Sequence, residues 1–166
     1  MDKITVQQQG DDFILTFPAI LDEEITFPKE RPRLSQRVIF ECRYLEVVSS
    51  FSMSVWIRWM RNLHPETQFV FRHCHRKIIE MINAVEGFLF ASAVVESFYM
   101  PYNCGHCDGE DEVLLTRGKE FVESVPGQKS RLLYPDQLNC PKCRNSMDVG
   151  VLENVYLRFL YREKEQ

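Results

Sequence analysis

Four of the six cysteines of this chain occur as two CxxC pairs, and this spacing constrains the fold more than any other feature of the sequence. The pairs are Cys104-Gly105-His106-Cys107 and Cys140-Pro141-Lys142-Cys143. A CxxC turn places two sulfur atoms on one side of a metal ion, and two such turns complete the tetrahedral shell of a structural zinc site. We therefore expect Cys104, Cys107, Cys140 and Cys143 to bind one Zn²⁺ ion that folds the C-terminal part of the chain.

The segment between the two pairs is longer than in simple zinc ribbons. Residues 108–139 separate them, against roughly 15 to 20 residues in the common pattern, so we expect a hairpin with an enlarged loop. A redox pair and an iron–sulfur centre remain as alternatives, although the flanking sequence is turn-rich rather than helical. Four cysteines leave no open position for water, so the site is expected to be structural, with His106 an exposed loop residue.

Composition allows a packed core and argues against a polyanion as the main partner. The chain has 166 residues, 45% of them apolar and 27% charged, which is typical of globular proteins. We predict a compact α/β domain at residues 1–97 and a small zinc-ribbon-like module at residues 98–166. The net charge of −4 makes nucleic acid an unfavourable partner.

Targeting signals are not recognisable in the sequence. The first residues, MDKITVQQQG, contain no apolar run that could serve as a signal sequence. No stretch reaches eighteen apolar residues, so we expect no transmembrane helix and no membrane partner. Four cysteines arranged as metal ligands indicate a reducing compartment, and we place the protein in the cytoplasm.

Strand and helix patterns alternate over the first hundred residues. The predicted elements are a hairpin at 4–8 and 13–17, an irregular segment at 18–37 with an extended piece at 25–27, strands at 37–42, 68–72 and 88–99, and helices at about 50–63 and 75–86. In the first helix, Phe51, Val55, Trp59 and Leu63 recur every fourth residue and are predicted to face the core. This order predicts an α/β sheet with some parallel pairing. The final run, 151–161, fits a closing strand or a short helix.

The segment 37–61, containing RVIFECRYLEVVSSFSMSVWIRWM, resembles the core of STAS domains, the fold of bacterial anti-sigma-factor antagonists and of sulfate-transporter tails. In that family a central strand ends in an acidic residue, a loop follows, and an Asp-Ser-Ser/Ala-Gly motif opens the next helix. The resemblance covers residues 4–94. It implies a STAS-like mixed sheet flanked by helices.

Carried over residue by residue, the resemblance places Glu41 at the acidic strand end. Ser49 stands for the motif's Asp, Ser50 for the phosphorylatable residue, and Ser52 for the glycine, with the bulky Phe51 between them. The resemblance thus implies phosphorylation or partner docking at Ser50, Ser49 and Ser52. Because the motif is degraded, an ordinary helix cap is the favoured reading of Ser50 itself.

These features together predict a non-enzymatic bacterial signalling or regulatory module that acts through protein–protein contact. No glycine-rich phosphate loop, triad or acid/base carboxylate pair occurs at usable spacing. By the resemblance, the partner is an anti-sigma or other kinase-like regulator, and the aromatic-rich helix is compatible with a homodimer. The alternative is a nucleic-acid-binding zinc ribbon, which is disfavoured by the acidic residues Asp108, Glu110, Asp111 and Glu112. A third class, an enzyme hidden in the sheet, is not excluded by fold alone.

Overall fold

The computed structural model of the chain describes residues 3–90, 92–123 and 130–161. It divides into two compact units, Met1–Glu96 (unit 1) and Ser97–Gln166 (unit 2). The boundary expected from the sequence lies one residue further along, between residues 97 and 98. Helices and sheets are both present, which confirms the mixed α/β class. None of the helices within the described ranges combines the length and apolar character needed to cross a membrane.

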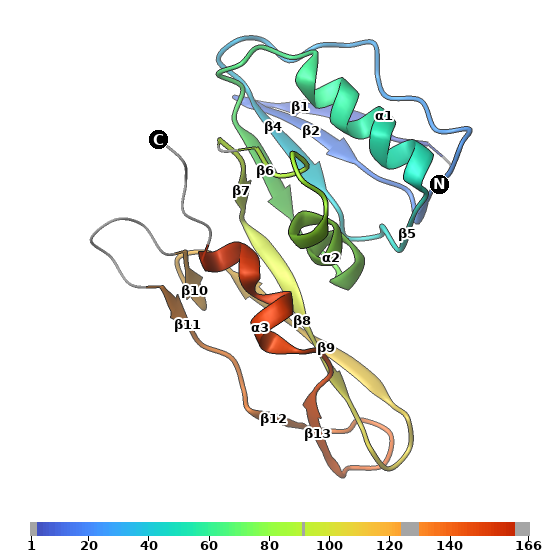
Figure 1. Cartoon of the computed structure of the whole chain (residues 1–166), viewed down its shortest axis with the longest axis vertical. Helices are drawn as coiled ribbons and strands as arrows, with labels where there is room; N and C mark the ends of the chain where they lie inside the picture. Colours follow the sequence, from blue (N-terminus) through green and yellow to red (C-terminus); the bar gives the residue numbers. More distant parts are fainter. Residues whose placement is uncertain (1–2, 91, 124–129, 162–166) are drawn as a thin grey trace. The chain divides into compact units, whose positions relative to one another are not determined.

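Unit 1 is built on a five-stranded sheet in the order β1-β2-β4-β6-β7 (Figure 1). The strands are β1 Thr5–Gln9, β2 Asp12–Thr16, β4 Arg37–Glu41, β6 Phe69–Arg72 and β7 Val94–Val95. The β1–β2 pair is an antiparallel hairpin, as predicted, and its turn uses Gly10 at φ 59°, a left-handed conformation that glycine adopts readily. The other three pairs are parallel, so β4 and β6 both end at the same edge of the sheet.

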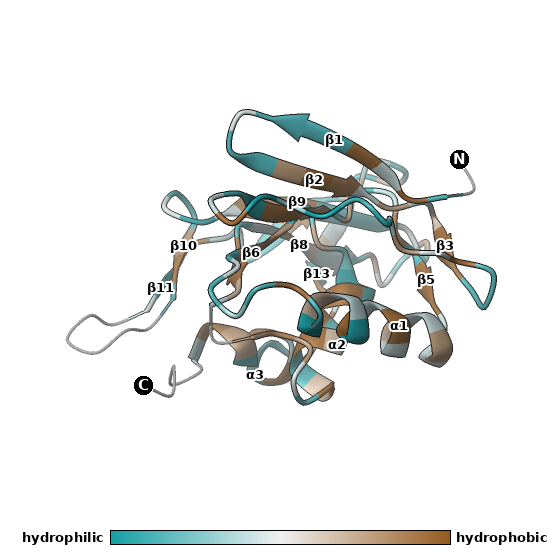
Figure 2. Ribbon diagram, turned by 90° about the horizontal axis from the view of Figure 1, so that it is seen from above, coloured by the Kyte–Doolittle hydropathy of each residue, from teal (hydrophilic) through white to brown (hydrophobic). Residues whose placement is uncertain are grey.

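Two helices make the crossovers between the parallel strands. Helix α1, Ser50–Arg61, links β4 to β6, and α2, Arg76–Ala84, links β6 to β7. Both helices cover the same face of the sheet (Figures 1 and 2). Since each helix follows the carboxyl end of a strand, both helices start at one edge of the sheet.

The core of unit 1 centres on Trp56 of α1. This side chain is fully buried, and its ring centroid lies 4.4 Å from that of Phe17, 5.1 Å from Phe40 and 5.0 Å from Phe88. Trp59 is also buried, and its indole Nε1 donates a hydrogen bond to the Pro28 carbonyl at 3.1 Å. Aromatic packing of this kind buries large areas and supplies much of a small core's stability.

The predicted inward face of α1 is wrong at its start. The structure exposes 53% of Phe51, whereas the buried residues are Ser52, Trp56, Trp59 and Met60. Ser52 tolerates burial because its hydroxyl donates a hydrogen bond to the Leu21 carbonyl at 2.8 Å, a residue 31 positions earlier. The buried face of the helix is thus rotated relative to the face that the fourfold apolar spacing indicates.

A small parallel pair was not predicted. Strand β3, Ile20–Leu21, pairs with β5, Val47–Val48, just before α1 begins. The extended piece expected at 25–27 forms no strand, although Ile25 is buried and the Phe27 ring lies 5.6 Å from that of Trp59. The strand expected at 88–99 is also shorter, because residues 86–88 form a turn and only β7 and the start of β8 are extended.

Unit 2 contains a four-stranded antiparallel sheet in the order β12-β13-β8-β9. These strands are β8 Ser97–Asn103, β9 Glu110–Thr116, β12 Gln137–Asn139 and β13 Ser146–Val149. A separate pair joins β10, Phe121–Val122, to β11, Arg131–Leu132. The C-terminal run forms a short helix, α3 Glu153–Tyr156, followed by a 3₁₀ turn, η1 Arg158–Tyr161. Around the buried Phe98 pack the rings of Phe121, Tyr156 and Phe159.

Candidate metal centre

Two β-hairpins of unit 2 carry the cysteine pairs at their turns. The first knuckle, residues 104–109, joins β8 to β9, and the second knuckle, residues 140–145, joins β12 to β13. Strand β13 pairs with β8 through Asp148 and Asn103, so the two hairpins belong to one sheet. This pairing places both knuckles at the same end of the sheet (Figure 1).

The two knuckles have the same backbone geometry. In the first, the Cys104 N–H donates to the Gly109 carbonyl at 2.8 Å; in the second, the Cys140 N–H donates to the Asn145 carbonyl, also at 2.8 Å. The residue after the second cysteine of each pair has a positive φ, 52° at Asp108 and 64° at Arg144. Non-glycine residues rarely adopt this conformation, and its repetition at equivalent positions indicates a turn shaped for its sulfur atoms.

The four cysteine sulfurs form one cluster. All four Sγ atoms lie within 4.8 Å of one another, and the Cys104–Cys143 and Cys107–Cys140 Sγ distances are both 3.5 Å. A tetrahedral zinc site with zinc–sulfur bonds of about 2.3 Å separates its sulfurs by about 3.8 Å. Cys104 and Cys140 are buried, whereas Cys107 and Cys143 are half-buried. The four side chains predicted as ligands are thus positioned to hold a metal ion.

Gly109 lets the first knuckle close against the sulfur cluster. A Cβ atom at this position would lie 3.1 Å from Cys140 Sγ and 3.2 Å from Cys107 Sγ, closer than nearly all real contacts of that kind. Because glycine has no side chain, the backbone can approach both sulfurs directly. The close approach across the two knuckles indicates that they pack as one site.

Hydrogen bonds in the second knuckle favour its thiolate forms. The backbone N–H of Asn145, aided by its side-chain amide 3.4 Å from Cys143 Sγ, lowers the pKa of Cys143 to about 6. The backbone N–H of Cys143 likewise lowers the pKa of Cys140, whereas hydrogen bonding to the Cys143 and Cys140 sulfurs raises the pKa of Cys107 to about 12. Four thiolates at this spacing repel one another unless a cation lies among them, so the donor set fits a metal dication.

The surroundings of the cluster also fit such an ion. Four thiolates around a dication carry a net charge of about −2. Lys142 and Arg144 flank this charge in the second knuckle, and the Lys142 Cδ lies 3.5 Å from the position of a Gly109 Cβ. His106 is exposed within the first knuckle, as expected from the sequence. Soft thiolate ligands in a tetrahedral arrangement are typical of zinc or iron–sulfur centres.

The three serines singled out by the sequence lie at the start of α1 in different environments. Ser49 is the N-cap, and its Oγ accepts the Ser52 backbone N–H at 3.1 Å. Ser52 is fully buried, with its hydroxyl bonded to the Leu21 and Ser49 carbonyls. Ser50, the first residue of the helix, is exposed. Of the three hydroxyls, that of Ser50 is therefore the one that solvent and partner molecules reach most readily.

A charged cluster at the carboxyl ends of β4 and β6 was not predicted. Glu41 Oε1 lies 2.8 Å from His73 Nδ1, and the Arg43 Nη2 lies 2.9 Å from His73 Nε2. His73 has a φ of 52° and holds this position directly after β6. The sequence feature that could have revealed this cluster is an acidic residue and a histidine at the ends of two adjacent parallel strands. Cys42 and Cys74, which directly follow Glu41 and His73 in the sequence, are fully buried, as free cysteines often are.

Among the residues that it describes, the structure thus places a four-cysteine cluster that could hold a metal ion in unit 2 and an exposed serine at a helix start in unit 1. Comparison of the chain with protein-family models, with curated proteins and with solved structures finds no match. A functional assignment therefore depends on the chemistry and geometry of these residues.

Proposed function

We propose that this protein is a non-enzymatic, STAS-like protein-interaction module stabilised by a structural zinc unit, and that it acts in bacterial signalling. Its docking face is the α1-start surface, which we define as Ile20, Val47, Ser50 and Phe51. The resemblance implies an anti-sigma or kinase-like regulator as the partner. The zinc ion holds unit 2 folded and takes no part in chemistry.

The observation that carries the proposal is the exposure of large apolar side chains around the start of α1. Ile20 is 54% exposed, Val47 50% and Phe51 53%. Ile20 and Val47 are directly paired across β3 and β5, and Phe51 is the second residue of α1, which begins two residues after β5 ends. Figure 2 shows β3 and β5 as adjacent hydrophobic segments beside α1. Clustered exposed apolar residues mark interaction sites more often than solvated surface.

The order of elements around Ser50 supports the STAS-like reading. Glu41 is the last residue of β4, residues 42–46 form a loop, and Ser49 caps α1. This is the acidic strand end, loop and serine-bearing helix start that the resemblance implies. Phosphorylation of the exposed Ser50 would add charge beside apolar neighbours and so disrupt a docked partner.

Zinc is the proposed metal because the donor set consists of four cysteines and leaves no position for water or substrate. The nucleic-acid alternative is disfavoured by charge, since Glu110, Asp111 and Glu112 are exposed on β9 directly after the first knuckle. Phosphate backbones are repelled by such a stretch. Lys142 and Arg144 are too few to outweigh it.

The proposal predicts that a partner contacts position 51 directly. A photo-crosslinking amino acid at position 51 of the full chain, expressed in its native cells, is expected to give one discrete crosslinked protein. The matched control is position 34, because Leu34 is 77% exposed but lies outside the α1-start surface. Phe51→Asp is expected to abolish co-purification of that protein while the circular dichroism spectrum stays unchanged. Equal crosslinking at both positions, or none at position 51, would contradict the proposal.

A further inference from the structure

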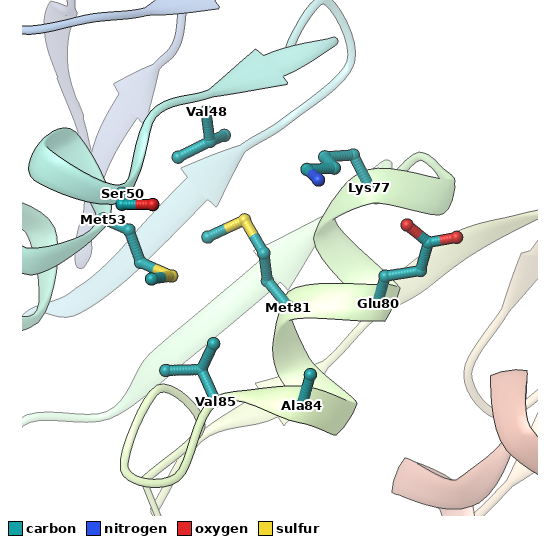
Figure 3. A pocket seen from close by; sticks show the side chains of 8 residues that line it. All are labelled: Val48, Ser50, Met53, Lys77, Glu80, Met81, Ala84 and Val85. Atoms are coloured by element: carbon teal, nitrogen blue, oxygen red, sulfur yellow. The ribbon is translucent and has the colours of Figure 1, made fainter.

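A groove runs between α1 and α2 beside the α1-start surface (Figure 3). It has a volume of about 350 Å³. Val48, Met53, Met81, Ala84 and Val85 supply an apolar lining, and the polar residues are Ser50, Lys77 and Glu80. Met53 and Met81 extend from the two helices toward one another across the groove (Figure 3). Methionine side chains adapt to varied apolar partners, so such a lining suits a protein surface.

One end of this groove is electropositive. Both α1 and α2 begin at the same edge of the sheet, and neither has an acidic residue in its first turn. The first turn of α2 instead carries Arg76 and Lys77, which add positive charge to the positive end of the helix dipole. This arrangement costs the fold stability, because cations are disfavoured at a helix N-terminus.

The negative charge in the groove is already compensated. Glu80 pairs with Arg76 at 2.8 Å along the same helix. Within the residues that the structure describes, Lys77 has no ion-pair partner, and it is exposed. The groove therefore presents an apolar floor with one uncompensated cation near two helix N-termini, which is complementary to an apolar surface bearing an anion.

We propose that the groove binds an amphipathic helix of the partner protein, with its apolar stripe between Met53 and Met81 and an acidic side chain against Lys77. The inference rests on the proposed function and identifies the partner's chemistry. A helix suits the groove because its two walls are themselves helices, whose apolar side chains Met53 and Met81 extend toward one another. Helices bind such grooves through residues at i, i+3, i+4 and i+7.

The test uses a defined probe rather than an unknown ligand. The full chain is presented to a display library of 16-residue helical peptides with randomised residues on one face. We expect enriched peptides to carry apolar residues at i, i+3, i+4 and i+7 and an excess of Asp and Glu next to them. Enrichment of Lys- and Arg-rich peptides, or no enrichment, would overturn the inference.

Substitutions at two exposed positions of the groove test peptide binding without disturbing the fold. Lys77→Glu is expected to weaken the binding of the enriched peptides about fivefold to tenfold and to raise the affinity of a charge-swapped peptide, because it reverses the uncompensated charge of the described groove lining. The same change adds an acid to the first turn of α2, so the melting temperature should stay equal or rise. Ala84→Glu should also block binding without unfolding, since Ala84 is exposed in the groove lining. Lys29→Glu, an exposed position outside the groove lining, is the charge control and should bind normally.

The remaining outcomes each identify another occupant and overturn the inference. If the peptides bind Lys77→Glu and Ala84→Glu as tightly as the unchanged chain, their binding site lies outside the groove. Competition by dodecanoate at micromolar concentration would identify a small amphipathic ligand as the occupant of the groove. A dimer that dissociates in Ala84→Glu would identify a second copy of the chain.

If position 51 crosslinks a specific partner but these groove variants still bind it, the groove inference fails while the proposed function stands. If position 51 crosslinks nothing, the proposed function itself fails.

Discussion

We expect Cys140→Ser to unfold unit 2 and to leave unit 1 folded. The sulfur of Cys140 is buried in the cluster, 3.5 Å from Cys107 Sγ, and its backbone N–H closes the second knuckle. With one ligand lost, the tetrahedral shell is incomplete, and structural zinc contributes about 10 to 16 kcal/mol of apparent binding free energy in small zinc domains. The described part of unit 2 centres on the single aromatic group around Phe98, which offers little to replace that energy.

Limited proteolysis with mass spectrometry measures this outcome. Cleavage sites should appear throughout residues 97–161 in Cys140→Ser, while a fragment close to residues 3–96 resists digestion. His106→Ser is the matched control, because His106 lies in the first knuckle but is exposed and is not one of the four sulfur ligands. It should keep its zinc and its protease resistance. Unchanged zinc content in Cys140→Ser would show that the residue is not a ligand.

We expect Trp56→Ala to destabilise unit 1 by about 3 to 5 kcal/mol. The side chain is fully buried among Phe17, Phe40 and Phe88, so truncation leaves a cavity lined by rigid rings. Its Nε1 has no hydrogen-bond partner within the described residues, so the loss arises from packing alone. A cost of this size is a large share of the 5 to 15 kcal/mol that holds most domains folded.

Urea unfolding followed by the fluorescence of Trp59 measures the change. The matched control is Phe51→Ala, which truncates an aromatic residue of the same helix that is 53% exposed. It should shift the free energy of unfolding by about 0.5 kcal/mol or less. Equal losses in the two variants would contradict the structure, because they would mean that Phe51 faces the core, as its spacing with Val55 and Trp59 indicates.

The candidate metal site was predictable because its information is local. Each CxxC pair fixes its own turn within six residues, and the two turns need only a shared sheet to meet. The hairpin at Gly10 and the two helices between parallel strands were predictable for the same reason. Zinc as the bound metal stays a prediction, and so does the STAS-like assignment.

The errors arise where distant residues decide the outcome. The rotated face of α1 buries Ser52, whose hydrogen bond to Leu21 spans 31 positions. The β3–β5 pair consists of two residues on each side, too short for an alternating pattern to be recognised. The contact between Glu41 and His73 joins residues 32 positions apart, and the α1–α2 groove exists only after both helices dock on the sheet.

Native mass spectrometry with elemental analysis shows whether one zinc ion binds Cys104, Cys107, Cys140 and Cys143. We expect one zinc per purified chain, lost on strong chelation together with the structure of unit 2. Iron in place of zinc, or a metal-free chain whose four thiols react freely while unit 2 stays folded, would contradict this expectation.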